Sequence, residues 1–208
     1  MIDFEALIFL PGASGSTEFW SPLIHHLSQD SNLKDHPARV VAYPEFNGQP
    51  AHSKVNNFQS LQTYVLDQIT VPSVIVAQSM GGIFAVQAAL EKPNLVSALV
   101  LIATSGGIDL SPFDVADWRE DYQKKFCVPS WFVDHQQSLD DQLDQMQCPI
   151  LLIWGDDDEI SPVAVGQYLQ SRFRKSQLHI IQKGKHDLAN VHAVEVGALI
   201  AKFIRQNS

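Results

Sequence analysis

The segment 74–90, VIVAQSMGGIFAVQAAL, constrains the fold of this chain more than any other. It begins with β-branched apolar residues, continues through small residues around Ser79, and ends in a run typical of a helix. A strand that passes directly into a helix needs a sharp turn, and the residues two before and two after its tip must be small. Ala77 and Gly81 meet this requirement. The segment therefore predicts a strand, a strained turn with Ser79 at its tip, and a helix.

Ser79 would then stand at the carboxyl end of a strand and at the N-terminus of a helix. Backbone amides at a helix N-terminus favour negative charge, so they can stabilise an oxyanion that forms on a bound carbonyl group. We expect the amide of Met80 to point at that place. The alternative is an ordinary glycine-containing turn in which the serine is incidental.

The run 77–82, AQSMGG, resembles the Gly-x-Ser-x-Gly-Gly turn of the α/β-hydrolase superfamily, in which the serine is the nucleophile. It differs at Ala77, which stands where the family usually has glycine and adds one methyl group. The resemblance implies an α/β-hydrolase fold with a mostly parallel central sheet, helices on both faces and a short helical cap. It also implies a serine, an acid and a histidine in that order along the chain.

Short apolar runs alternate with runs of helical spacing along most of the chain. The predicted strands are residues 6–10, 39–43, 74–76, 96–103, 149–154 and 178–181. The predicted helices are residues 18–27, 58–69, 83–90, 113–126, 163–173 and 191–204. Strands that alternate with helices form parallel βαβ units. Because 208 residues suit one domain, we expect a single α/β domain over residues 1–208.

Residues 105–147 interrupt this alternation, because they contain no convincing strand. One face of the helix predicted there carries Val115, Trp118, Tyr122 and Phe126. The resemblance implies that residues 105–147 form a cap, and we expect Trp118, Tyr122 and Phe126 to contact the substrate. Alternatively the stripe packs on the main domain, and both can hold.

The same insertion carries further aromatic, apolar and cationic residues. The aromatic ones include Phe113, Trp131 and Phe132, and Leu139, Leu143 and Met146 could line a second apolar face. Arg119, Lys124 and Lys125 are expected to be solvated, with contact to an acidic carrier protein as the alternative. Because of the apolar stripe, we expect acyl groups of short to medium length to be preferred over charged or very polar ones.

An acidic loop, GDDDEISP, follows the strand predicted at residues 149–154. It resembles the family's Gly-x-x-Asp-x-x-x-Pro pattern, which selects Asp158 as the acid and leaves Asp156 and Asp157 as loop carboxylates. The alternatives are a solvated acidic turn and a cation site. The loop lacks the alternating ligand spacing of a calcium site, so we expect no metal.

His186 is the expected base among eight histidines, because it follows a predicted strand and a glycine. It resembles the family's terminal Gly-His loop, although Lys185 separates Gly184 from the histidine here. His179 lies within a predicted strand, where a packed or surface role is expected. The others lack the required order along the chain: His25, His26, His36, His52, His135 and His192.

The loop after the first predicted strand is the place for a second oxyanion donor. The family carries His-Gly-x there, and the amide after the glycine donates; mapped onto this chain, that donor is Ala13. Pro11 replaces the usual histidine, and proline has no N–H to donate. The alternative is an ordinary loop between a strand and a helix.

Composition excludes several classes of function. The net charge of −9 argues against a nucleic-acid partner. No apolar run approaches the roughly 20 residues of a membrane span, and the first residues do not resemble a secretory signal. Cys127 and Cys148 show neither metal spacing nor a disulfide framework, which is compatible with the cytoplasm. We expect no cofactor.

Together these residues predict a serine hydrolase that cleaves a carboxylic ester or thioester with a small, largely apolar acyl group. Ser79 would attack the carbonyl, His186 would move the proton, and Asp158 would orient His186. Three alternatives stay open. They are carbon–carbon hydrolysis or a lyase step on the same residues, an esterase that releases pimeloyl groups from acyl carrier protein, and a non-catalytic interaction protein of the same fold.

Overall fold

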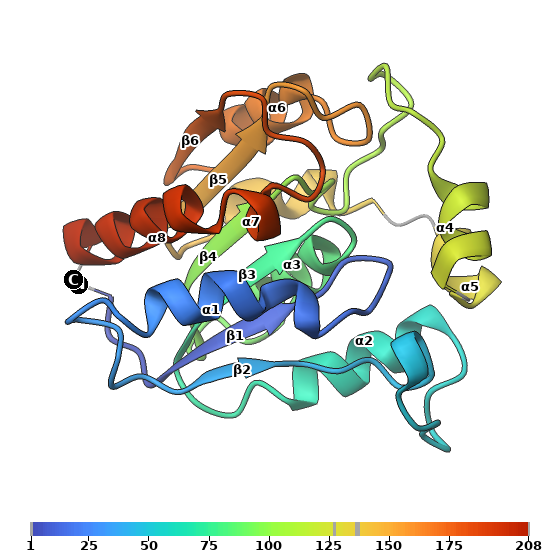
Figure 1. Cartoon of the computed structure of the whole chain (residues 1–208), viewed down its shortest axis with the longest axis horizontal. Helices are drawn as coiled ribbons and strands as arrows, with labels where there is room; N and C mark the ends of the chain where they lie inside the picture. The colour runs from blue at the N-terminus through green and yellow to red at the C-terminus, as the bar shows by residue number, and fades with distance from the viewer. Residues whose placement is uncertain (1, 127, 136–137, 208) are drawn as a thin grey trace.

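The computed structural model describes residues 2–126, 128–135 and 138–207. Its centre is a parallel sheet with the strand order β2-β1-β3-β4-β5-β6 (Figure 1). The strands are β1 (Ala6–Leu10), β2 (Ala38–Val40), β3 (Ser73–Gln78), β4 (Val96–Ile102), β5 (Ile150–Gly155) and β6 (Ser176–Ile181). The predicted α/β fold with a mostly parallel sheet is confirmed.

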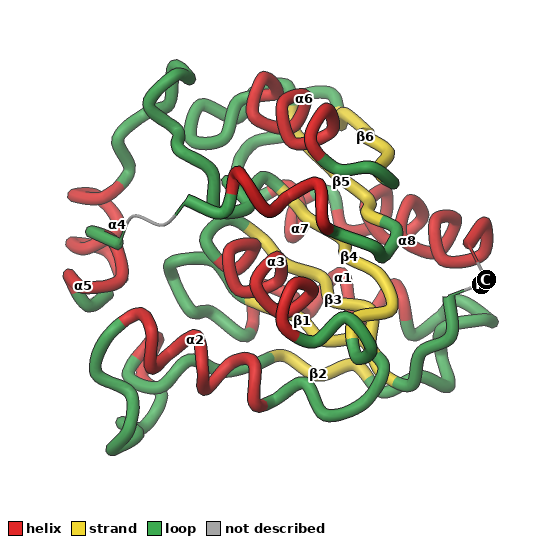
Figure 2. Tube along the Cα trace, turned by 180° about the vertical axis from the view of Figure 1, so that it is seen from behind, coloured by secondary structure: helices red, strands yellow, loops and turns green. Residues whose placement is uncertain are grey.

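Helices cover both faces of the sheet. On one face lie α1 (Ser21–Leu27), the short α7 (Leu188–Val191) and α8 (Ala193–Asn207), as Figure 1 shows. On the other face lie α2 (Phe58–Asp67), α3 (Gly81–Glu91) and α6 (Val163–Arg172), as Figure 2 shows from behind. Strand residues alternate between the two resulting cores: Leu7 and Phe9 pack in one, Ile8 and Leu10 in the other. The continuous apolar runs of the sequence therefore belong to strands buried on both sides.

Two predicted elements differ from the structure at their ends. The strand predicted at residues 39–43 becomes β2, which ends at Val40; the amide of Val41 still donates to the carbonyl of Phe9 at 3.0 Å, and Tyr43 beyond it is completely buried. The helix predicted at residues 191–204 is α7 followed by α8, with the break at His192. The helix predicted at residues 18–27 begins with the 3-10 helix η1 (Glu18–Trp20) and continues as α1.

Residues 103–149, called here the β4–β5 segment, leave the end to which the β4 arrow points and return to the opposite end of the sheet, where β5 begins beside Leu99 (Figure 1). The segment contains α4 (Arg119–Phe126), α5 (Ser130–Val133) and the 3-10 helix η3 (Asp140–Gln145). Its described residues include no strand, which agrees with the sequence. Cys127, considered above, lies outside the described residues.

The helix predicted from residue 113 is wrong over its first part, because α4 begins only at Arg119. The amide of Ala116 donates to the carbonyl of Glu159 at 2.8 Å, which draws this stretch away from helical geometry. The carboxylate of Asp117 then accepts from the amide of Arg119 at 3.1 Å and begins the helix. Val115 and Trp118 consequently both precede α4, and the predicted stripe is not one helical face.

The β4–β5 segment is attached to the main fold by apolar side chains. Phe132 is completely buried and packs edge-on against Phe46 and stacked on Phe58. Leu139, Leu143 and Met146 are also buried. The part of the segment around α5 and η3 is therefore core, whereas α4 has no fully buried residue.

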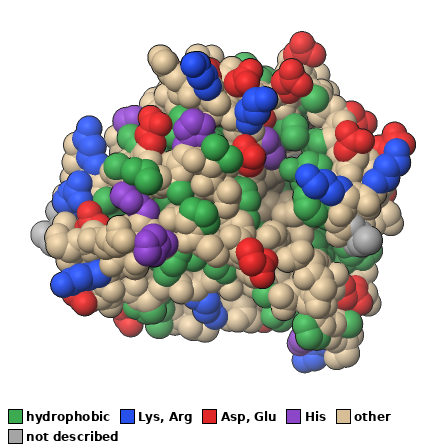
Figure 3. Space-filling view, viewed as in Figure 1, with side chains coloured by type: hydrophobic (Ala, Val, Ile, Leu, Met, Phe, Trp, Pro, Cys, Tyr) green, Lys and Arg blue, Asp and Glu red, His purple; other side chains and the backbone are tan. Residues whose placement is uncertain are grey.

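The face that carries α1 and α8 shows acidic and basic side chains interspersed (Figure 3). None of the described helices combines the length and the apolar character needed to cross a membrane.

Candidate active site

Ser79 lies in the turn that joins β3 to α3, and its backbone has φ of +52°. L-residues rarely adopt this left-handed conformation, so the surroundings must hold it. A Cβ on Gly81 would lie 2.5 Å from the carbonyl oxygen of Pro11, and one on Gly82 would overlap the side chain of Thr104. Glycine is therefore required at both places by the closeness of β1 and β4, as the sequence predicted for Gly81.

The turn is also fastened to the neighbouring strand. The amide of Ser79 donates to the carbonyl of Ile102 at 3.0 Å. The hydroxyl of Thr104 donates to the carbonyl of Ser79 and accepts from the amide of Gly106 at 3.0 Å. Hydrogen bonds on both sides of Ser79 thus fix the direction in which its side chain leaves the backbone.

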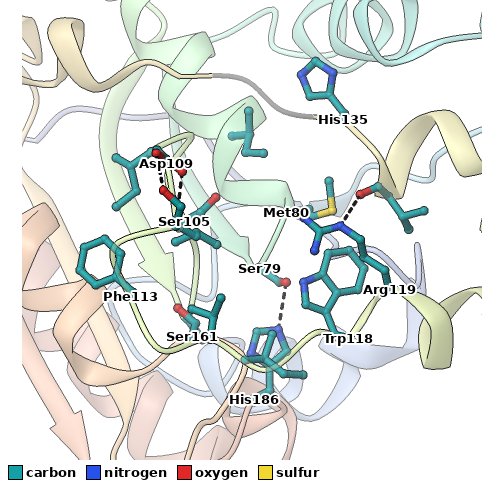
Figure 4. A pocket seen from close by; sticks show the side chains of 18 of the residues that line it. Ser79, Met80, Ser105, Asp109, Phe113, Trp118, Arg119, His135, Ser161 and His186 are labelled. Atoms are coloured by element: carbon teal, nitrogen blue, oxygen red, sulfur yellow. Dashed lines mark hydrogen bonds between the residues drawn. The ribbon is translucent and has the colours of Figure 1, made fainter.

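Three side chains from separate loops form a continuous chain of hydrogen bonds. Nδ1 of His186 lies 2.9 Å from Oδ2 of Asp158, and Nε2 of His186 lies 2.9 Å from Oγ of Ser79 (Figure 4). An ionised carboxylate can only accept, so Nδ1 donates to Asp158 and leaves Nε2 to accept the serine proton. This is the tautomer that a general base for Ser79 requires.

Asp158 is buried and fully hydrogen bonded, whereas its neighbours are exposed. Its Oδ1 accepts from the amides of Ile160 at 2.9 Å and Ser161 at 3.0 Å, which leaves Oδ2 for His186. The carboxylates of Asp156 and Asp157 point elsewhere: the first accepts from the amide of Lys183 and the second lies 3.8 Å from Lys185. Of the three consecutive aspartates, the structure brings Asp158 to the histidine.

The loops that carry Asp158 and His186 pack directly against each other. A Cβ on Gly155 would overlap the backbone of Gly184, and the amide of Asp157 donates to the carbonyl of Gly184 at 3.0 Å. The side-chain amide of Gln78, which precedes the serine, donates to the carbonyl of His186 at 3.0 Å. The loops after β3, β5 and β6 are therefore connected through backbone contacts as well as through the three side chains.

Met80 lines the first of two cavities at Ser79, and Ala13 lines the second. Within the described residues, neither of their backbone amides donates to another backbone or side-chain group. Gly12 approaches the serine so closely that a Cβ there would lie 3.0 Å from the Cβ of Ser79. The buried hydroxyl of Tyr43 donates to the carbonyl of Pro11 at 2.8 Å and so fixes this loop. Both amides remain available to an oxyanion.

A cavity of about 810 Å³ opens on one side of Ser79. The first cavity, as we call it, has an apolar lining that includes Ile83, Ile108, Leu110, Phe113, Trp118 and Ile160. Its polar lining includes Ser105, Asp109, Ser111, Arg119, His135 and Ser161. Figure 4 shows Arg119 and Trp118 on one side and Ser105 and Asp109 on the opposite side, with Ser79 between them.

A second cavity, of about 690 Å³, shares Ser79, Ile160 and His186 with the first. Tyr122 and Phe126 line this second cavity, together with Ala13. Burial, and then the nearby negative charges of Asp158 and Asp187, raise the pKa of the Tyr122 hydroxyl. Tyr122 therefore keeps its proton at neutral pH and can act as a hydrogen-bond donor beside the histidine.

The three aromatic residues predicted to contact substrate are thus divided between two cavities. Trp118 lines the first cavity, and Tyr122 and Phe126 line the second. Trp118 and Tyr122 pack edge to face with ring centroids 5.2 Å apart. Phe132, one of the aromatic residues noted in the insertion, is core and lines neither cavity.

Sequence reasoning missed three residues that shape the site. Gln78 and Tyr43 act through hydrogen bonds to backbone carbonyls, a role that no local pattern reveals. Arg119 was expected in solvent; 43% of its side chain is exposed, and it also lines the first cavity. The start of α4 at Arg119 could have indicated its placement, had the capping role of Asp117 been recognised in the sequence. Within the described residues, no group of three or more His, Cys, Asp or Glu side chains is arranged to hold a metal ion.

A model of the alpha/beta hydrolase fold family matches residues 5–126 of this chain. A putative non-heme chloroperoxidase of Synechocystis sp. is 38% identical over 80 residues, which cover 38% of this chain and 28% of that protein. A pimeloyl-[acyl-carrier protein] methyl ester esterase of Neisseria meningitidis serogroup C is 25% identical over 213 residues, which cover 81% of this chain and 83% of that protein.

Among solved structures, a lipase-esterase related protein from Clostridium acetobutylicum superposes with a TM-score of 0.76 at 18% identity. The superposition covers 95% of this chain and 93% of that one. At this level of identity the likeness concerns the fold.

Proposed function

Because this chain belongs to the alpha/beta hydrolase fold family, we propose that it is a serine hydrolase that cleaves a carboxylic ester or thioester with a small, largely apolar acyl group. The hydrogen-bonded chain from Asp158 through His186 to Ser79 is the observation that carries the proposal. A serine hydroxyl is a weak nucleophile at neutral pH, and this arrangement supplies both the base it needs and the carboxylate that stabilises the charged base.

The reaction begins with attack of Ser79 Oγ on the carbonyl carbon while Nε2 of His186 accepts the hydroxyl proton. The imidazolium that forms is stabilised by the carboxylate of Asp158. The carbonyl oxygen becomes an oxyanion, which accepts hydrogen bonds from the amides of Ala13 and Met80. Both amides are held in place before the substrate arrives, so little reorganisation is needed in the transition state.

The tetrahedral intermediate collapses when the bond to the leaving alcohol or thiol breaks and Nε2–H of His186 protonates the departing atom. An acyl group remains on Ser79. A water molecule then gives a proton to Nε2 and attacks the acyl carbon, and a second oxyanion forms at the same two amides. Its collapse breaks the acyl bond to Ser79, whose oxygen takes the proton back from His186.

The two cavities support a substrate with two separate halves. Ser79 and His186 line both, so the reacting carbonyl can sit where the cavities meet while one half of the ester extends into each. The β4–β5 segment supplies Trp118 to the first cavity and Tyr122 to the second. We therefore assign this segment the role of a cap that selects the substrate. The pimeloyl-[acyl-carrier protein] methyl ester esterase among its relatives also favours an ester substrate.

An active-site label tests the nucleophile. A fluorophosphonate probe should label the protein once, and Ser79→Ala should remove the label. Ser105→Ala is the matched control, because Ser105 lines the same cavity but has no hydrogen bond to His186; it should keep the label. Labelling that persists in Ser79→Ala would contradict the assignment.

A panel of esters and thioesters tests the reaction. Hydrolysis that depends on Ser79 would support the proposal. A protein that is labelled at Ser79 but hydrolyses no member of the panel would contradict ester cleavage and would favour carbon–carbon hydrolysis or a lyase step by the same nucleophile.

A further inference from the structure

Arg119 brings a positive charge into the first cavity. Among the described residues that line this cavity, it is the one lysine or arginine. Figure 4 shows its guanidinium reaching from α4 toward the space beside Met80 and Ser79. A permanent charge on the wall of a cavity that is otherwise rich in apolar side chains bears directly on which substrates can enter.

The guanidinium is only partly satisfied by the protein. Its Nε donates to the carbonyl of Val133 at 3.1 Å, and one Nη1 hydrogen lies toward the exposed carboxylate of Asp117 at 3.4 Å. The other Nη1 hydrogen and both hydrogens of Nη2 have no acceptor within the described part of the chain. Those hydrogens can reach a ligand without breaking an existing bond.

The guanidinium is also held in position. The bond to Val133 fixes one edge, and the ring of Trp118 lies 5.7 Å from the guanidinium carbon. A side chain that is already restrained loses less conformational freedom when it binds an anion. Arginine in this state presents a planar pair of donors that matches a carboxylate.

Among the described residues that line the first cavity, Asp109 supplies the one carboxylate, and it does not pair with Arg119. Asp109 lies on the opposite side of the cavity, as Figure 4 shows. Its oxygens accept from the amide of Ser111 at 2.9 Å and from the hydroxyl of Ser111 at 2.7 Å. These hydrogen bonds lower the pKa of Asp109. Arg119 therefore remains available for an anion that comes from outside the protein.

We propose that the substrate carries a carboxylate on the half that occupies the first cavity, and that Arg119 binds it. The proposal rests on the ester hydrolysis proposed above and names its substrate class: an ester with a short apolar chain that ends in a carboxylate. Ile83, Ile108 and Leu110 line the cavity and suit the apolar chain. This proposal departs from the sequence-based expectation that uncharged acyl groups are preferred, because Arg119 lines the first cavity while 43% of its side chain stays exposed.

The test compares esters that differ only in charge. Ethyl hemisuccinate and hemiglutarate carry the carboxylate on the acyl half, and their methyl-ketone isosteres are neutral. A second series places the carboxylate on the alcohol half, with acetate esters of hydroxy acids and of the matching hydroxy ketones. The measured quantity is the ratio of kcat/KM for the anionic ester to that for its neutral isostere, after subtraction of uncatalysed hydrolysis.

We expect this ratio to exceed about ten in one of the two series for the unmodified protein, which also shows which half occupies the first cavity. Arg119→Met should lower the ratio about tenfold to a hundredfold, since hydrogen bonds to charged groups are worth more than neutral ones. Arg119→Lys keeps the charge without the planar donors and should retain part of the preference. Lys124→Gln removes a charge from the same helix, where Lys124 pairs with Glu120 and lines neither cavity, and should leave the ratio unchanged.

The outcomes separate this proposal from ester hydrolysis itself. If neutral esters are hydrolysed through Ser79 but no anionic ester is preferred in either series, the carboxylate site is overturned and the hydrolase stands. If no ester is hydrolysed, the binding of glutarate to the Ser79→Ala protein is measured by calorimetry. Binding that is lost in Ser79→Ala combined with Arg119→Met supports the anion site, and absence of binding overturns it. A circular dichroism spectrum unchanged by Arg119→Met excludes a folding defect as the cause.

Discussion

The two sides of the first cavity are held by different kinds of contact. On the sheet side, Asp158 accepts two backbone amides and Ser79 is tied through its own amide and carbonyl. On the other side, α4 has no fully buried residue, and Trp118 and Tyr122 are half-buried, pack edge to face on each other and lie against the edge of the core. Backbone contacts hold the reacting groups, whereas side-chain packing holds the groups that face the substrate.

This difference predicts that the sheet side of the first cavity determines the reaction rate and that the α4 side determines which substrates are preferred. A backbone fixed by neighbouring strands keeps Ser79, His186 and Asp158 within hydrogen-bond distance without help from the substrate. Side chains that pack on one another can be exchanged with little effect on the sheet. Substitutions on the sheet side should therefore change kcat, and substitutions on α4 should change the relative rates of different substrates.

The largest expected effect is the loss of kcat when the carboxylate of Asp158 is replaced. Asp158→Asn should lower kcat by a factor on the order of 10³–10⁴, because an asparagine amide favours the wrong histidine tautomer. Asp157→Asn is the matched control, since Asp157 is exposed and lies 3.8 Å from Lys185; its kcat should stay near that of the unmodified protein. Steady-state kinetics of both variants on one ester provide the measurement. Equal losses in the two variants would remove the distinction between a fixed and an exposed carboxylate.

Gly12→Ala should lower kcat about tenfold to a hundredfold, because the new Cβ would lie 2.5 Å from Oε1 of Gln78 and 3.0 Å from the Cβ of Ser79. The loop must then shift and carry the amide of Ala13 away from the oxyanion. Gly48→Ala serves as the comparison, since Gly48 has φ of +76° but nothing within 4 Å of a Cβ. It should cost about 1 kcal/mol of stability and leave kcat unchanged. An unchanged kcat in Gly12→Ala would show that this loop is less rigid than the sheet-side contacts indicate.

Tyr43→Phe should lower the free energy of unfolding by about 1–2 kcal/mol, because the carbonyl of Pro11 loses its buried donor. We expect kcat to fall a few-fold, since the loop that carries Ala13 is then held less firmly. Urea unfolding and kinetics on a neutral ester measure the two effects. A loss of stability with no change in kcat would place Tyr43 among the purely structural residues of the core.

The smallest expected effect is at Trp118. Trp118→Ala should alter the chain-length profile for esters from acetyl to decanoyl by roughly fourfold per methylene at the affected lengths, and should change stability little. Phe132→Ala is the contrasting variant, because Phe132 is completely buried in the same segment; it should cost about 3–5 kcal/mol of stability. Parallel profiles for the unmodified protein and Trp118→Ala would mean that this side of the cavity does not select substrates.

The same division explains what the sequence could predict. The turn around Ser79 was predictable because close packing of strands leaves no room for a side chain at Gly81. The small residue that this packing requires can be recognised in the local sequence. The α/β order was predictable because strands buried on both faces give continuous apolar runs. The beginning of α4 was not, since the amide of Ala116 pairs with Glu159, which is far along the chain. The direction of Arg119 follows from where that helix begins, for which the one local signal is the carboxylate of Asp117 that accepts from the amide of Arg119.

The contact between Gly155 and Gly184 has a consequence for motion. The two loops touch through backbone atoms that cannot be shortened or rotated aside, so an outward fluctuation of one loop carries the other with it. Asp158 and His186 therefore move together. Thermal fluctuations change the position of this pair relative to Ser79 more than they change the distance between Asp158 and His186. A side chain at Gly155 or Gly184 would force the two loops apart and would therefore shift Asp158 and His186 relative to each other.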